Sequence, residues 1–457
     1  MPRTASELRA DAERIWRAGV AAVMPERLVQ SHVRVEGHRL IIGEDTVDLR
    51  GVERIAIVGA GKAAGAMVVA LEDILGPKRL AEKSVTGWVN VPADCVVPTQ
   101  RVHLHPARPA AVNEPRMEGV KGTQQIRKIV SSLGRSDLCL CVLSGGGSAL
   151  MPGPIERISL EEKIRLTRLL SAAGANIEQL NTVRQQVSFV KGGKLACDCT
   201  AGRLITLAIS DVPGDPIDII ASGPTVHTSK TVTDALAVLE ELGLTAERSL
   251  KPLIRYLKGH EGMWVWEPAS SAIGIGPPAE MHYVIIGNNA VAVDAAGTEA
   301  ERLGYSHVMM SATKPEGPAE DVGRHLAEAA LRMREQEGPN CLISGGEPTV
   351  TLVDEFHRGK GGRNQQLALA ALTAVGDCRN IAILSGGTDG EDGPTDAAGA
   401  FVTEEVVRAA RERQLDPEDY LARNDAYDFF ERSGGLFITG PTLTNVCDMR
   451  IIAVARN

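Results

Sequence analysis

Short apolar runs and longer amphipathic stretches alternate along most of this chain. Residues 137–143 form an apolar run followed by a turn, which is typical of a buried strand, whereas residues 160–173 repeat apolar positions at helical spacing. Strands that alternate with helices of about 10–15 residues favour right-handed βαβ units and parallel sheets. The pattern therefore predicts an α/β protein with doubly wound sheets.

A first series of elements fills the N-terminal part of the chain. It starts with an amphipathic helix and a small hairpin, whose strands we expect at residues 32–35 and 39–42. The later strands are predicted at residues 54–58, 87–91, 137–143 and 203–209. The helices of this series are predicted at residues 1–23, 63–75, 115–133, 160–173, 177–189 and 231–260.

A second series follows a stretch that lacks regular periodicity. Residues 261–280 contain Gly, Pro and Ser and two of the four Trp, which indicates an irregular connection. Beyond it we expect strands at residues 283–286, 307–311, 341–343, 381–384, 437–439 and 448–454, and helices at residues 290–303, 319–337, 364–375 and 404–413. The predicted domains are residues 1–260 and residues 281–457, joined by residues 261–280.

Composition narrows the classes of function. The chain has 457 residues with 44% hydrophobic content, enough for sizeable cores, and a net charge of −9 that disfavours nucleic acid as a partner. No apolar run reaches the length of a membrane span, and residues 1–22 do not resemble a signal peptide. The eight cysteines lack zinc spacing, so we expect reduced thiols and a cytoplasmic location.

Several of the 47 glycines gather where predicted strands end. Three strands run into the tripeptide Ser-Gly-Gly, at residues 144–146, 344–346 and 385–387, and a fourth ends in Gly59-Ala60-Gly61-Lys62. Ligands of open α/β sheets bind beyond the carboxyl ends of strands, where glycine permits a close backbone approach. Plain tight turns are the alternative, but four such ends favour a ligand site.

The turn at residues 59–64 fits a loose dinucleotide fingerprint, G-x-G-x-x-A. Two details disfavour that use: the next strand ends in Asn90 instead of an acidic partner for ribose, although Asp94 is near, and Lys62 occupies the turn itself. The sequence also lacks the P-loop pattern and the protein-kinase signatures. A nucleotide would therefore be bound by another architecture.

Charged residues accompany these turns. Lys62 and Asp211 follow predicted strands, Arg363 lies in a Gly-rich loop at a helix start, and Glu347 follows a Ser-Gly-Gly tripeptide. Three more acids stand within eight residues, namely Asp389, Asp392 and Asp396. Carboxylates beside a phosphate site can hold Mg²⁺ or accept a proton. The alternative is a turn role for Asp389 and Asp392 and a helix N-cap role for Asp396. Cations, acids and backbone amides together favour phosphoryl transfer.

Residues 181–193 carry a polar, cationic pattern. Arg184, Ser188 and Lys191 lie at i, i+4 and i+7, which would place them on one helix face beside Gly192-Gly193. Such a face can orient a carboxylate substrate. An ordinary solvated helix face is an equally good interpretation of the same pattern.

These motifs resemble glycerate kinases of the type that carries a C-terminal MOFRL domain. The resemblance rests on residues 59–62, 143–150, 181–193, 343–350, 361–367 and 384–399 and covers nearly the whole chain. It implies a two-lobed α/β fold: a Rossmann-like N-terminal lobe with a parallel sheet, a smaller α/β C-terminal lobe, and an active-site cleft between them. It also implies ATP- and Mg²⁺-dependent phosphorylation of D-glycerate, generally at the 2-hydroxyl, and a homodimer. Gln185-Gln186 depart from the frequent Lys-His of the family, and Met151-Pro152 from its frequent Leu-Pro.

The resemblance assigns roles to individual residues. Lys62 and Arg363 match the family's basic active-site residues, and Asp211 matches its Ser-Asp turn, so we expect these three to be catalytic. Substrate or phosphate contacts are expected from Gly61, Gly145, Gly146, Gly147, Ser148, Asn181, Arg184, Lys191, Gly386, Gly387 and Thr388. The metal ligands are expected among Glu347, Asp389, Asp392 and Asp396. Family members have also been labelled NAD(P)H-dependent hydroxypyruvate reductases, which is the alternative enzyme, and a non-catalytic sensor is the other.

Overall fold

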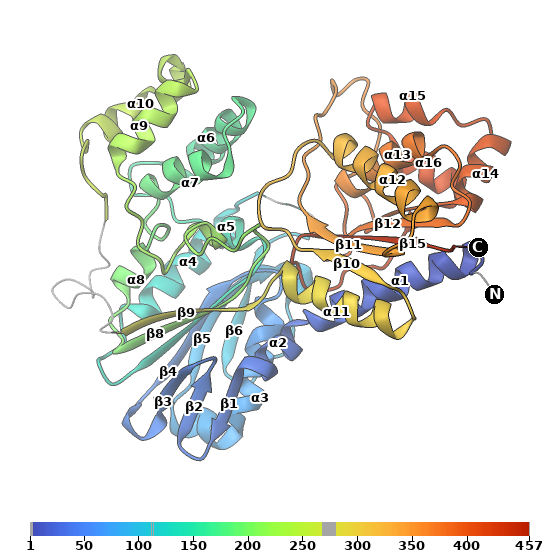
Figure 1. Ribbon diagram of the computed structural model, residues 1–457. Coiled ribbons are helices and arrows are strands. Elements are labelled where there is room, and N and C mark those ends of the chain that lie inside the picture. The colour runs from blue at the N-terminus through green and yellow to red at the C-terminus, as the bar shows by residue number, and fades with distance from the viewer. Residues whose placement is uncertain (1–2, 111, 113, 267–279, 457) are drawn as a thin grey trace. The chain divides into compact units, whose positions relative to one another are not determined.

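The computed structural model describes residues 3–110, 112, 114–266 and 280–456. The chain forms two compact units, each assembled from separated stretches (Figure 1). The parallel-sheet unit comprises Pro25–Ser210 and Asp215–Ile286. The mixed-sheet unit comprises Met1–Met24, Asp211–Gly214 and Gly287–Asn457.

The parallel-sheet unit is built on six strands in the order β6-β5-β4-β7-β8-β9. Their bounds are β4 Ile55–Ala60, β5 Thr86–Pro92, β6 Val102–Arg108, β7 Leu138–Leu143, β8 Arg203–Ile209 and β9 Glu280–Gly287. The pairs from β6 to β8 are all parallel, and β9 starts beside the start of β8, where the Glu280 amide donates to the Gly202 carbonyl at 3.3 Å. A parallel N-terminal sheet is therefore confirmed.

The strand order contains one topological switch. From β4 the chain winds outward through β5 and β6, and it then crosses back to β7 and continues to β8 and β9. Helices α3 (Ala64–Glu82) and α4 (Met117–Val130) make the crossovers. The switch falls between β4 and β7, so the crevice that such sheets use for ligands lies at the turns after Ala60 and Leu143.

Of the remaining helices of this unit, α6, α7, α9 and α10 gather away from the sheet strands, whereas α5 and α8 lie beside them (Figure 1). The bounds of these helices are α5 Gly147–Leu150, α6 Leu160–Ala172, α7 Ile177–Gln186, α8 Lys194–Asp198, α9 Val232–Glu241 and α10 Lys251–Lys258. The single helix expected over residues 231–260 is wrong, because Gly243 at φ 68° ends α9 and two short 3₁₀ turns, Leu244–Ala246 and Arg248–Leu250, precede α10. The predicted helix 177–189 likewise ends early, at Gln186.

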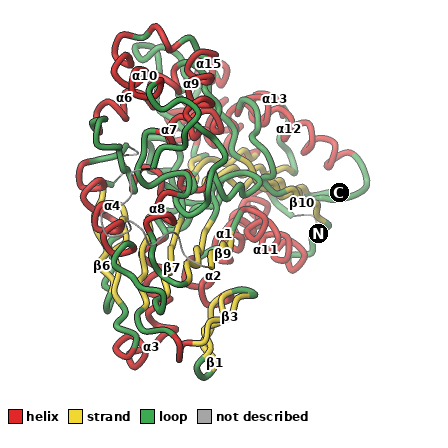
Figure 2. The backbone as a smooth tube through the Cα atoms, turned by 90° about the vertical axis from the view of Figure 1, so that its left-hand side faces the viewer, coloured by secondary structure: helices red, strands yellow, loops and turns green. Residues whose placement is uncertain are grey.

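A small antiparallel sheet completes the parallel-sheet unit. It consists of β1 Val33–Glu36, β2 Arg39–Ile42 and β3 Asp45–Asp48, preceded by helix α2 Pro25–His32 (Figure 2). The predicted hairpin is thus confirmed and gains a third strand. Short 3₁₀ turns stand at Leu49–Gly51, Ala93–Cys95 and Ile220–Ser222.

The mixed-sheet unit has six strands in the order β10-β11-β15-β12-β13-β14. They are β10 His307–Met310, β11 Cys341–Gly346, β12 Ile381–Gly387, β13 Gly399–Thr403, β14 Leu436–Phe437 and β15 Asp448–Val454. Only β10 and β11 pair in parallel, and the other four pairs are antiparallel. The expectation of a second parallel sheet is therefore wrong, because β15 and β13 enter the sheet against the direction of β11 and β12.

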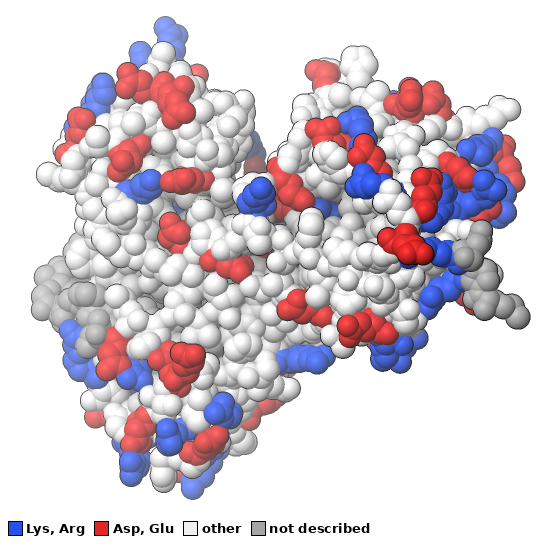
Figure 3. All heavy atoms as spheres, viewed as in Figure 1, with Lys and Arg blue, Asp and Glu red and all other residues white. Residues whose placement is uncertain are grey.

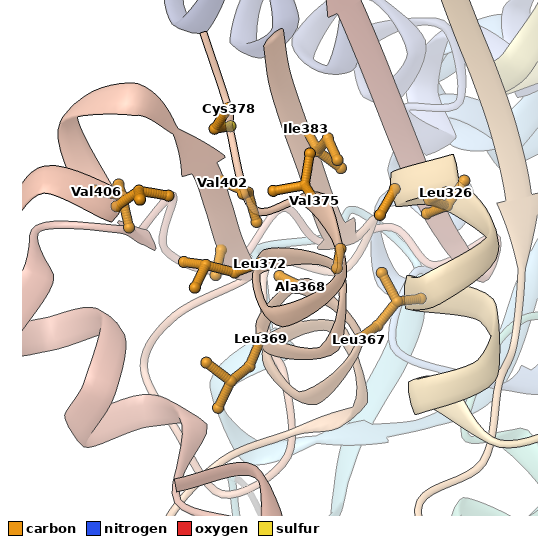
Figure 4. Close-up of a cluster of buried hydrophobic side chains, with 14 of the residues drawn as sticks. Leu326, Leu367, Ala368, Leu369, Leu372, Val375, Cys378, Ile383, Val402 and Val406 are labelled. Atoms are coloured by element: carbon orange, nitrogen blue, oxygen red, sulfur yellow. The ribbon is translucent and has the colours of Figure 1, made fainter. Parts of the chain in front are cut away.

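Helix α13 lies at the centre of the core of the mixed-sheet unit. The helices of this unit are α1 Ala5–Ala22, α11 Asn289–Arg302, α12 Ala319–Glu335, α13 Arg363–Val375, α14 Glu404–Glu412, α15 Pro417–Ala422 and α16 Ala426–Ser433. Figure 4 shows α13 contributing Leu367, Ala368, Leu369 and Leu372 to a cluster that also contains Leu326, Ile383 and Val402. Because α13 is buried on most sides, its first residue, Arg363, is held in a defined place.

The N-terminal helix α1 belongs to the mixed-sheet unit. It buries Leu8, Ile15 and Trp16 along one face, and the Trp16 indole donates to the Gly386 carbonyl at 3.2 Å. The predicted division at residues 1–260, 261–280 and 281–457 instead groups α1 with the N-terminal part and β9 with the C-terminal part. An amphipathic pattern shows that a face is buried but not against which sheet. As a division into domains it stays a prediction, and residues 267–279 of the expected connection lie outside the described residues.

The next features concern the charged surface, the length of the helices and the state of the cysteines. On the face shown in Figure 3, acidic and basic side chains are interspersed. Among the described residues no helix combines the length and apolarity that crossing a bilayer demands. All eight cysteines are free thiols, and seven of them are buried.

Gly59 provides a test of the close strand approach in the switch region. Its φ is 151°, and a Cβ atom there would lie 1.9 Å from the Val142 carbonyl oxygen of β7. We predict that Gly59→Ala lowers the free energy of unfolding by at least about 2 kcal/mol, measured by urea denaturation. The control is Gly37→Ala, at φ 60° with open space around it, which should cost only about 1 kcal/mol. Equal effects of the two substitutions would contradict the packing assigned to β4 and β7.

Candidate active site

The turn from β4 into α3 uses its own backbone amides. Gly61 N donates to the Asn90 carbonyl at 3.2 Å, Lys62 N donates to the Gly145 carbonyl at 2.9 Å, and Ala63 N donates to Ser144 Oγ at 3.0 Å. These are the amides that would bind pyrophosphate in a dinucleotide site. The predicted phosphate contact from the Gly61 amide is therefore corrected: it holds two strand ends together.

Asn90 gives the same result at the end of β5. Its side chain is completely buried, donates to the Leu150 carbonyl at 2.8 Å and accepts from the Trp88 indole at 3.2 Å. It occupies the position of the acidic ribose partner in the fingerprint but has its hydrogen bonds within the core. The fingerprint at residues 59–64 thus belongs to a packing motif.

The turn after β7 presents its backbone differently. Gly147 N donates to the Ser144 carbonyl at 3.1 Å, whereas the amides of Gly145 and Gly146 have no hydrogen-bond partner among the described residues. Gly146 has φ 78°, and a Cβ atom built on it would lie 3.9 Å from Lys62 Cγ. The Lys62 side chain therefore runs beside the turn that was expected to cradle phosphate.

Ser148, the next residue, is the centre of a polar cluster. Lys191 Nζ donates to Ser148 Oγ at 2.7 Å and to its carbonyl at 2.9 Å, and Arg184 Nη2 donates to the same hydroxyl. Ser148 Oγ also lies 2.9 Å from Ser222 Oγ, which donates to Asn181 Oδ1 at 2.8 Å. The structure thus brings together four predicted substrate contacts from separate elements and adds Ser222, which no sequence motif singled out.

This cluster is largely withdrawn from solvent. Lys191 is 1% exposed and Ser188 is buried, while Arg184 is partly exposed with its Nε buried and unpartnered. Desolvation lowers the pKa of Arg184 to about 10, and desolvation with the charge of Arg184 lowers the pKa of Lys191. The interpretation as a solvated helix face is therefore wrong, because the chain leaves the helix at Gln186 and turns Lys191 inward.

The two glutamines that replace the family's Lys-His have a different task. Gln185 Nε2 donates to the Asp218 carbonyl at 3.3 Å, and Gln186 Nε2 donates to the Lys230 carbonyl at 2.9 Å. Both side chains are buried. They fix the loops around α7, so this departure leaves the Ser148 cluster intact.

In the mixed-sheet unit, two Ser-Gly-Gly tripeptides flank one strand. Gly346 of β11 and Gly387 of β12 both stand opposite Asp448, the first residue of β15, and Ser344 and Ser385 both stand opposite Arg450. A Cβ atom at Gly346 would lie 1.9 Å from Glu316 Oε2, so only glycine leaves room for that side chain. The repeated tripeptide therefore makes space around residues 448–450.

Arg363 is bound by two acids at this place. Its Nε and Nη2 donate to the two carboxylate oxygens of Asp448 at 2.7 and 3.0 Å, and its Nη1 donates to Glu347 Oε1 at 2.8 Å. Desolvation opposes the charge of Arg363, but the charges of Asp448 and Glu347 outweigh it and raise the pKa of the guanidinium. The predicted catalytic Arg363 is thus a fixed cation.

Asp448 is the functional candidate that sequence reasoning missed. It is fully buried, and its pattern gave only a closing strand. Arg450, two residues on, forms a bidentate pair with Glu316 at 2.9 and 2.5 Å. Asn289 of α11 supports the same strand by donating to the Val446 and Asp448 carbonyls at 2.9 and 3.1 Å. A signal did exist, since an Asp and an Arg on one face of an apolar strand are unusual in a core.

The four predicted metal-ligating acids do not form one centre. Glu347 lies near Asp389, because burial first and then the charges of Asp448 and Asp389 raise the pKa of Glu347 against the attraction of Arg363. Asp392 is buried and accepts from the backbone amides of Asn364 and Gln365 at 3.0 and 2.8 Å. Asp392 therefore caps the start of α13, whereas its expected alternative was a role in a turn.

Asp396 is exposed and accepts from the Tyr427 hydroxyl at 2.7 Å. Within the described ranges, no three Asp, Glu, His or Cys side chains are grouped as a metal centre. The metal candidates that remain accessible are Glu347, with a side chain 39% exposed, and Asp389, which is partly exposed.

The loop after β12 serves the sheet. Gly386 and Gly387 belong to β12, and Gly387 N donates to the Ala398 carbonyl at 2.8 Å. The Thr388 hydroxyl is buried and donates to the Cys447 carbonyl at 2.6 Å. The expected phosphate cradle is corrected here, because the Gly387 amide and the Thr388 hydroxyl hold the start of β15 in place.

Asp211 reaches this neighbourhood through its backbone. Its carbonyl accepts from Cys447 Sγ at 3.2 Å. Burial raises the pKa of the Cys447 thiol, and the charges of Glu347, Asp211 and Asp448 raise it further. The charges of these three acids therefore act on one thiol of the mixed-sheet unit, and the catalytic role expected for Asp211 stays a prediction.

Comparisons with known proteins show which family the chain belongs to. The model of the domain of unknown function DUF4147 matches residues 11–257, and that of the MOFRL family matches residues 340–448. The glycerate kinase of Mus musculus is 34% identical over 509 aligned residues, covering 97% of this chain and 93% of that protein. The D-glycerate 2-kinase of Thermotoga maritima is 35% identical over 441 residues, covering 96% of each.

A solved structure supports the same relationship. The crystal structure of a glycerate kinase from Thermotoga maritima superposes with a TM-score of 0.77 at 32% identity and covers 98% of this chain and 100% of that one. The present protein is therefore an enzyme of the phosphotransferase class. It belongs to the glycerate kinase family, with a DUF4147 region followed by a MOFRL region.

The buried pair of Asp448 and Arg363 should matter for stability. We predict that Asp448→Asn lowers the free energy of unfolding by about 2–4 kcal/mol, since it leaves a largely buried guanidinium without its bidentate partner. Glu347→Gln, at the more exposed end of Arg363, is the control and should cost less than about 1 kcal/mol. Urea denaturation measures both, and an Asp448→Asn protein as stable as the control would refute the assignment.

The capping carboxylate Asp392 predicts a pH dependence. Burial raises its pKa to about 7, against the two backbone amides that favour its charged form. The folded protein thus holds this proton more tightly than the unfolded chain, so the contribution to stability is full below about pH 4 and is lost as the pH rises through 7. The stability of the wild type relative to Asp392→Asn should fall with pH over this window, by at most about 1.4 kcal/mol per pH unit. A constant difference would show that Asp392 does not titrate there.

Proposed function

We propose that this protein transfers the γ-phosphoryl group of MgATP to the 2-hydroxyl of D-glycerate and releases 2-phospho-D-glycerate and ADP. The family carries the class of reaction, and the D-glycerate 2-kinase of Thermotoga maritima supports the 2-position. Two clusters of charged residues supply the proposed contacts to the substrates.

The observation that carries the proposal is the Ser148 cluster. Two cations, Arg184 and Lys191, donate to one neutral hydroxyl and form no salt bridge with a described acid. A carboxylate such as that of D-glycerate supplies the missing negative charge. Asn181 and Ser222, already linked by a hydrogen bond, are suitable partners for the hydroxyls of a three-carbon acid.

The Arg363 cluster has the opposite charge. Two carboxylates, those of Asp448 and Glu347, bind one guanidinium, and the charge of Asp389 acts on Glu347. Mg²⁺ binds through one or two carboxylates while phosphates and water complete its oxygen ligands, so Glu347 and Asp389 fit the group. When bound, the ion would neutralise charge on the nucleotide phosphates.

The chemical step requires a cation, a base and a positioned hydroxyl. In the proposed step the 2-hydroxyl oxygen forms a bond to the γ-phosphorus, the bond from that phosphorus to the ADP oxygen breaks, and the hydroxyl proton passes to the Asp211 carboxylate. Lys62 stabilises the charge on the transferring group. The unpaired amides of Gly145 and Gly146 beside Lys62 support a phosphate contact at the same turn.

The reductase alternative has less support. The amides of residues 61–63 and the Asn90 side chain are engaged within the protein, where NAD(P)H would need them. Incubation with NADPH or NADH and hydroxypyruvate should leave the nicotinamide absorbance unchanged.

We also propose that the protein is located in the cytoplasm. The free thiols support this location, because disulfides are rare in a reducing compartment.

The test of the function is product identification. Purified protein is incubated with ATP, Mg²⁺ and D-glycerate, and the product is identified by phosphorus NMR. We expect 2-phosphoglycerate. Formation of 3-phosphoglycerate would overturn the assigned hydroxyl, and absence of any phosphoglycerate would overturn the function.

Lys62 should contribute to the chemical step. We predict that Lys62→Met lowers kcat by about 10²–10³, by analogy with loss of one donor to a developing oxyanion. The matched control is Lys128→Met, an exposed lysine of α4, which should retain wild-type kcat. Turnover is measured by ADP release, and near-normal turnover of Lys62→Met would remove it from the phosphoryl site.

A further inference from the structure

Lys163 is a buried lysine that neither the motifs nor the family resemblance singled out. It lies on α6 and is 3% exposed. Its ammonium nitrogen is completely enclosed and has no hydrogen-bond partner among the described residues. Lysine is almost never fully buried without a partner, so this side chain requires an explanation.

The surroundings of Lys163 supply more positive charge. The groups whose charges act on it are Arg184, on α7, and Lys194, at the start of α8. The charges of Arg184 and Lys163 act in turn on Lys191 and lower its pKa, in addition to desolvation. Lys194 Nζ donates to the Gln185 and Ser188 carbonyls at 2.6 and 2.8 Å, which places its ammonium group beside the end of α7.

No acid balances this charge. The salt bridges of the described residues include none from Lys163, Arg184 or Lys191 to a carboxylate, while nearby cations do have acids: Arg127 pairs with Asp198 at 2.5 Å and Lys230 with Glu178 at 3.0 Å. Helices α6 and α7 also contribute to one apolar cluster. It contains Leu166 and Leu170 of α6, Val183 of α7, and Val187, the residue after α7. Within the part of the chain that the structure describes, the site is therefore positive, buried and without a carboxylate counter-ion.

We propose that Lys163, together with Arg184 and Lys191, forms a built anion site that receives the carboxylate of the substrate. This inference rests on the proposed function for the identity of the anion, and it assigns Lys163 as a further substrate-binding residue. A bound carboxylate gives the unpartnered ammonium a hydrogen-bond acceptor and offsets the mutual repulsion of the cations.

The protonation chemistry of the site agrees with this role. Desolvation, followed by the charges of Arg184 and Lys194, lowers the pKa of Lys163, and that of Lys191 is lowered in the same way. An anion reverses the electrostatic part of these shifts, so the lysines bind their protons more tightly when the site is filled. Selectivity for a charged substrate over a neutral one follows, because a neutral polyol leaves the cations uncompensated.

The experiment compares ligand binding to the full-length wild type, Lys163→Met and the exposed control Lys128→Met. Isothermal titration calorimetry measures the Kd of D-glycerate, of MgATP and of glycerol separately, and urea denaturation measures stability. We expect Lys163→Met to raise the Kd of D-glycerate by about 10- to 100-fold, as for a lost charge-assisted hydrogen bond. Binding of MgATP and of glycerol should stay within twofold of the wild type, and Lys128→Met should match the wild type throughout.

Stability separates a binding role from a structural one. A lysine kept for ligand binding is a cost to the fold, so Lys163→Met should be at least as stable as the wild type. A variant that is less stable yet binds D-glycerate normally would overturn the proposal. If Lys163→Met fails to fold, Lys163→Gln takes its place, with the same expected loss of D-glycerate affinity.

The remaining outcomes distinguish the anion and the function. Loss of MgATP affinity with D-glycerate binding intact would assign the site to a phosphate and overturn the carboxylate assignment. Wild type that binds D-glycerate but forms no phosphoglycerate would overturn the proposed function and leave the Lys163 site standing. Unchanged D-glycerate affinity in a folded Lys163→Met would overturn the Lys163 site alone.

Discussion

Burying positive charge without a counter-ion is costly, and the parallel-sheet unit of this protein does so on and beside helices α6 and α7. Lys163 and Lys191 are buried, and Arg184 has a buried, unpartnered Nε. The apolar cluster formed by α6 and α7 stabilises this part of the fold and offsets the cost of the buried charges. The anion that completes the charge balance comes from outside the chain, which connects the stability of this region to its ligand.

The mixed-sheet unit resolves the same physical problem within the protein. Arg363 is bound by Asp448 and Glu347, and Arg450 by Glu316, so each buried guanidinium has an internal partner. The excess of carboxylates there suits a cation, as the excess of amines around Ser148 suits an anion. The glycines of residues 344–346 follow from this arrangement, because side chains at Gly345 or Gly346 would collide with Asn289, Glu316 and Arg450.

Much of the fold and part of the candidate site could be predicted from sequence. Strand β8 matches its predicted bounds, since a short apolar run of this length suits a buried strand and is too short for a typical helix. The direction of β15 and the location of α1 depend on which surfaces meet, which no local pattern encodes. Arg184 and Lys191 were found because they lie in one motif. Lys163 was missed because it is one of several charged residues on the amphipathic helix α6, and Asp448 was missed because it begins a strand that was predicted only to close the sheet. Gly61, Gly387 and Thr388 look like ligand contacts in sequence but hold strand ends together.

The most direct test asks whether the buried amines of the parallel-sheet unit bind an anion. Calorimetric titration of D-glycerate at pH 8, repeated in buffers with different ionisation enthalpies, counts the protons that accompany binding. Because desolvation and mutual repulsion lower the pKa of Lys163 and Lys191 in the free protein, filling the site should draw protons from solution. We predict net proton uptake for the wild type that is reduced in Lys163→Met. Binding without proton exchange in either protein would contradict the account.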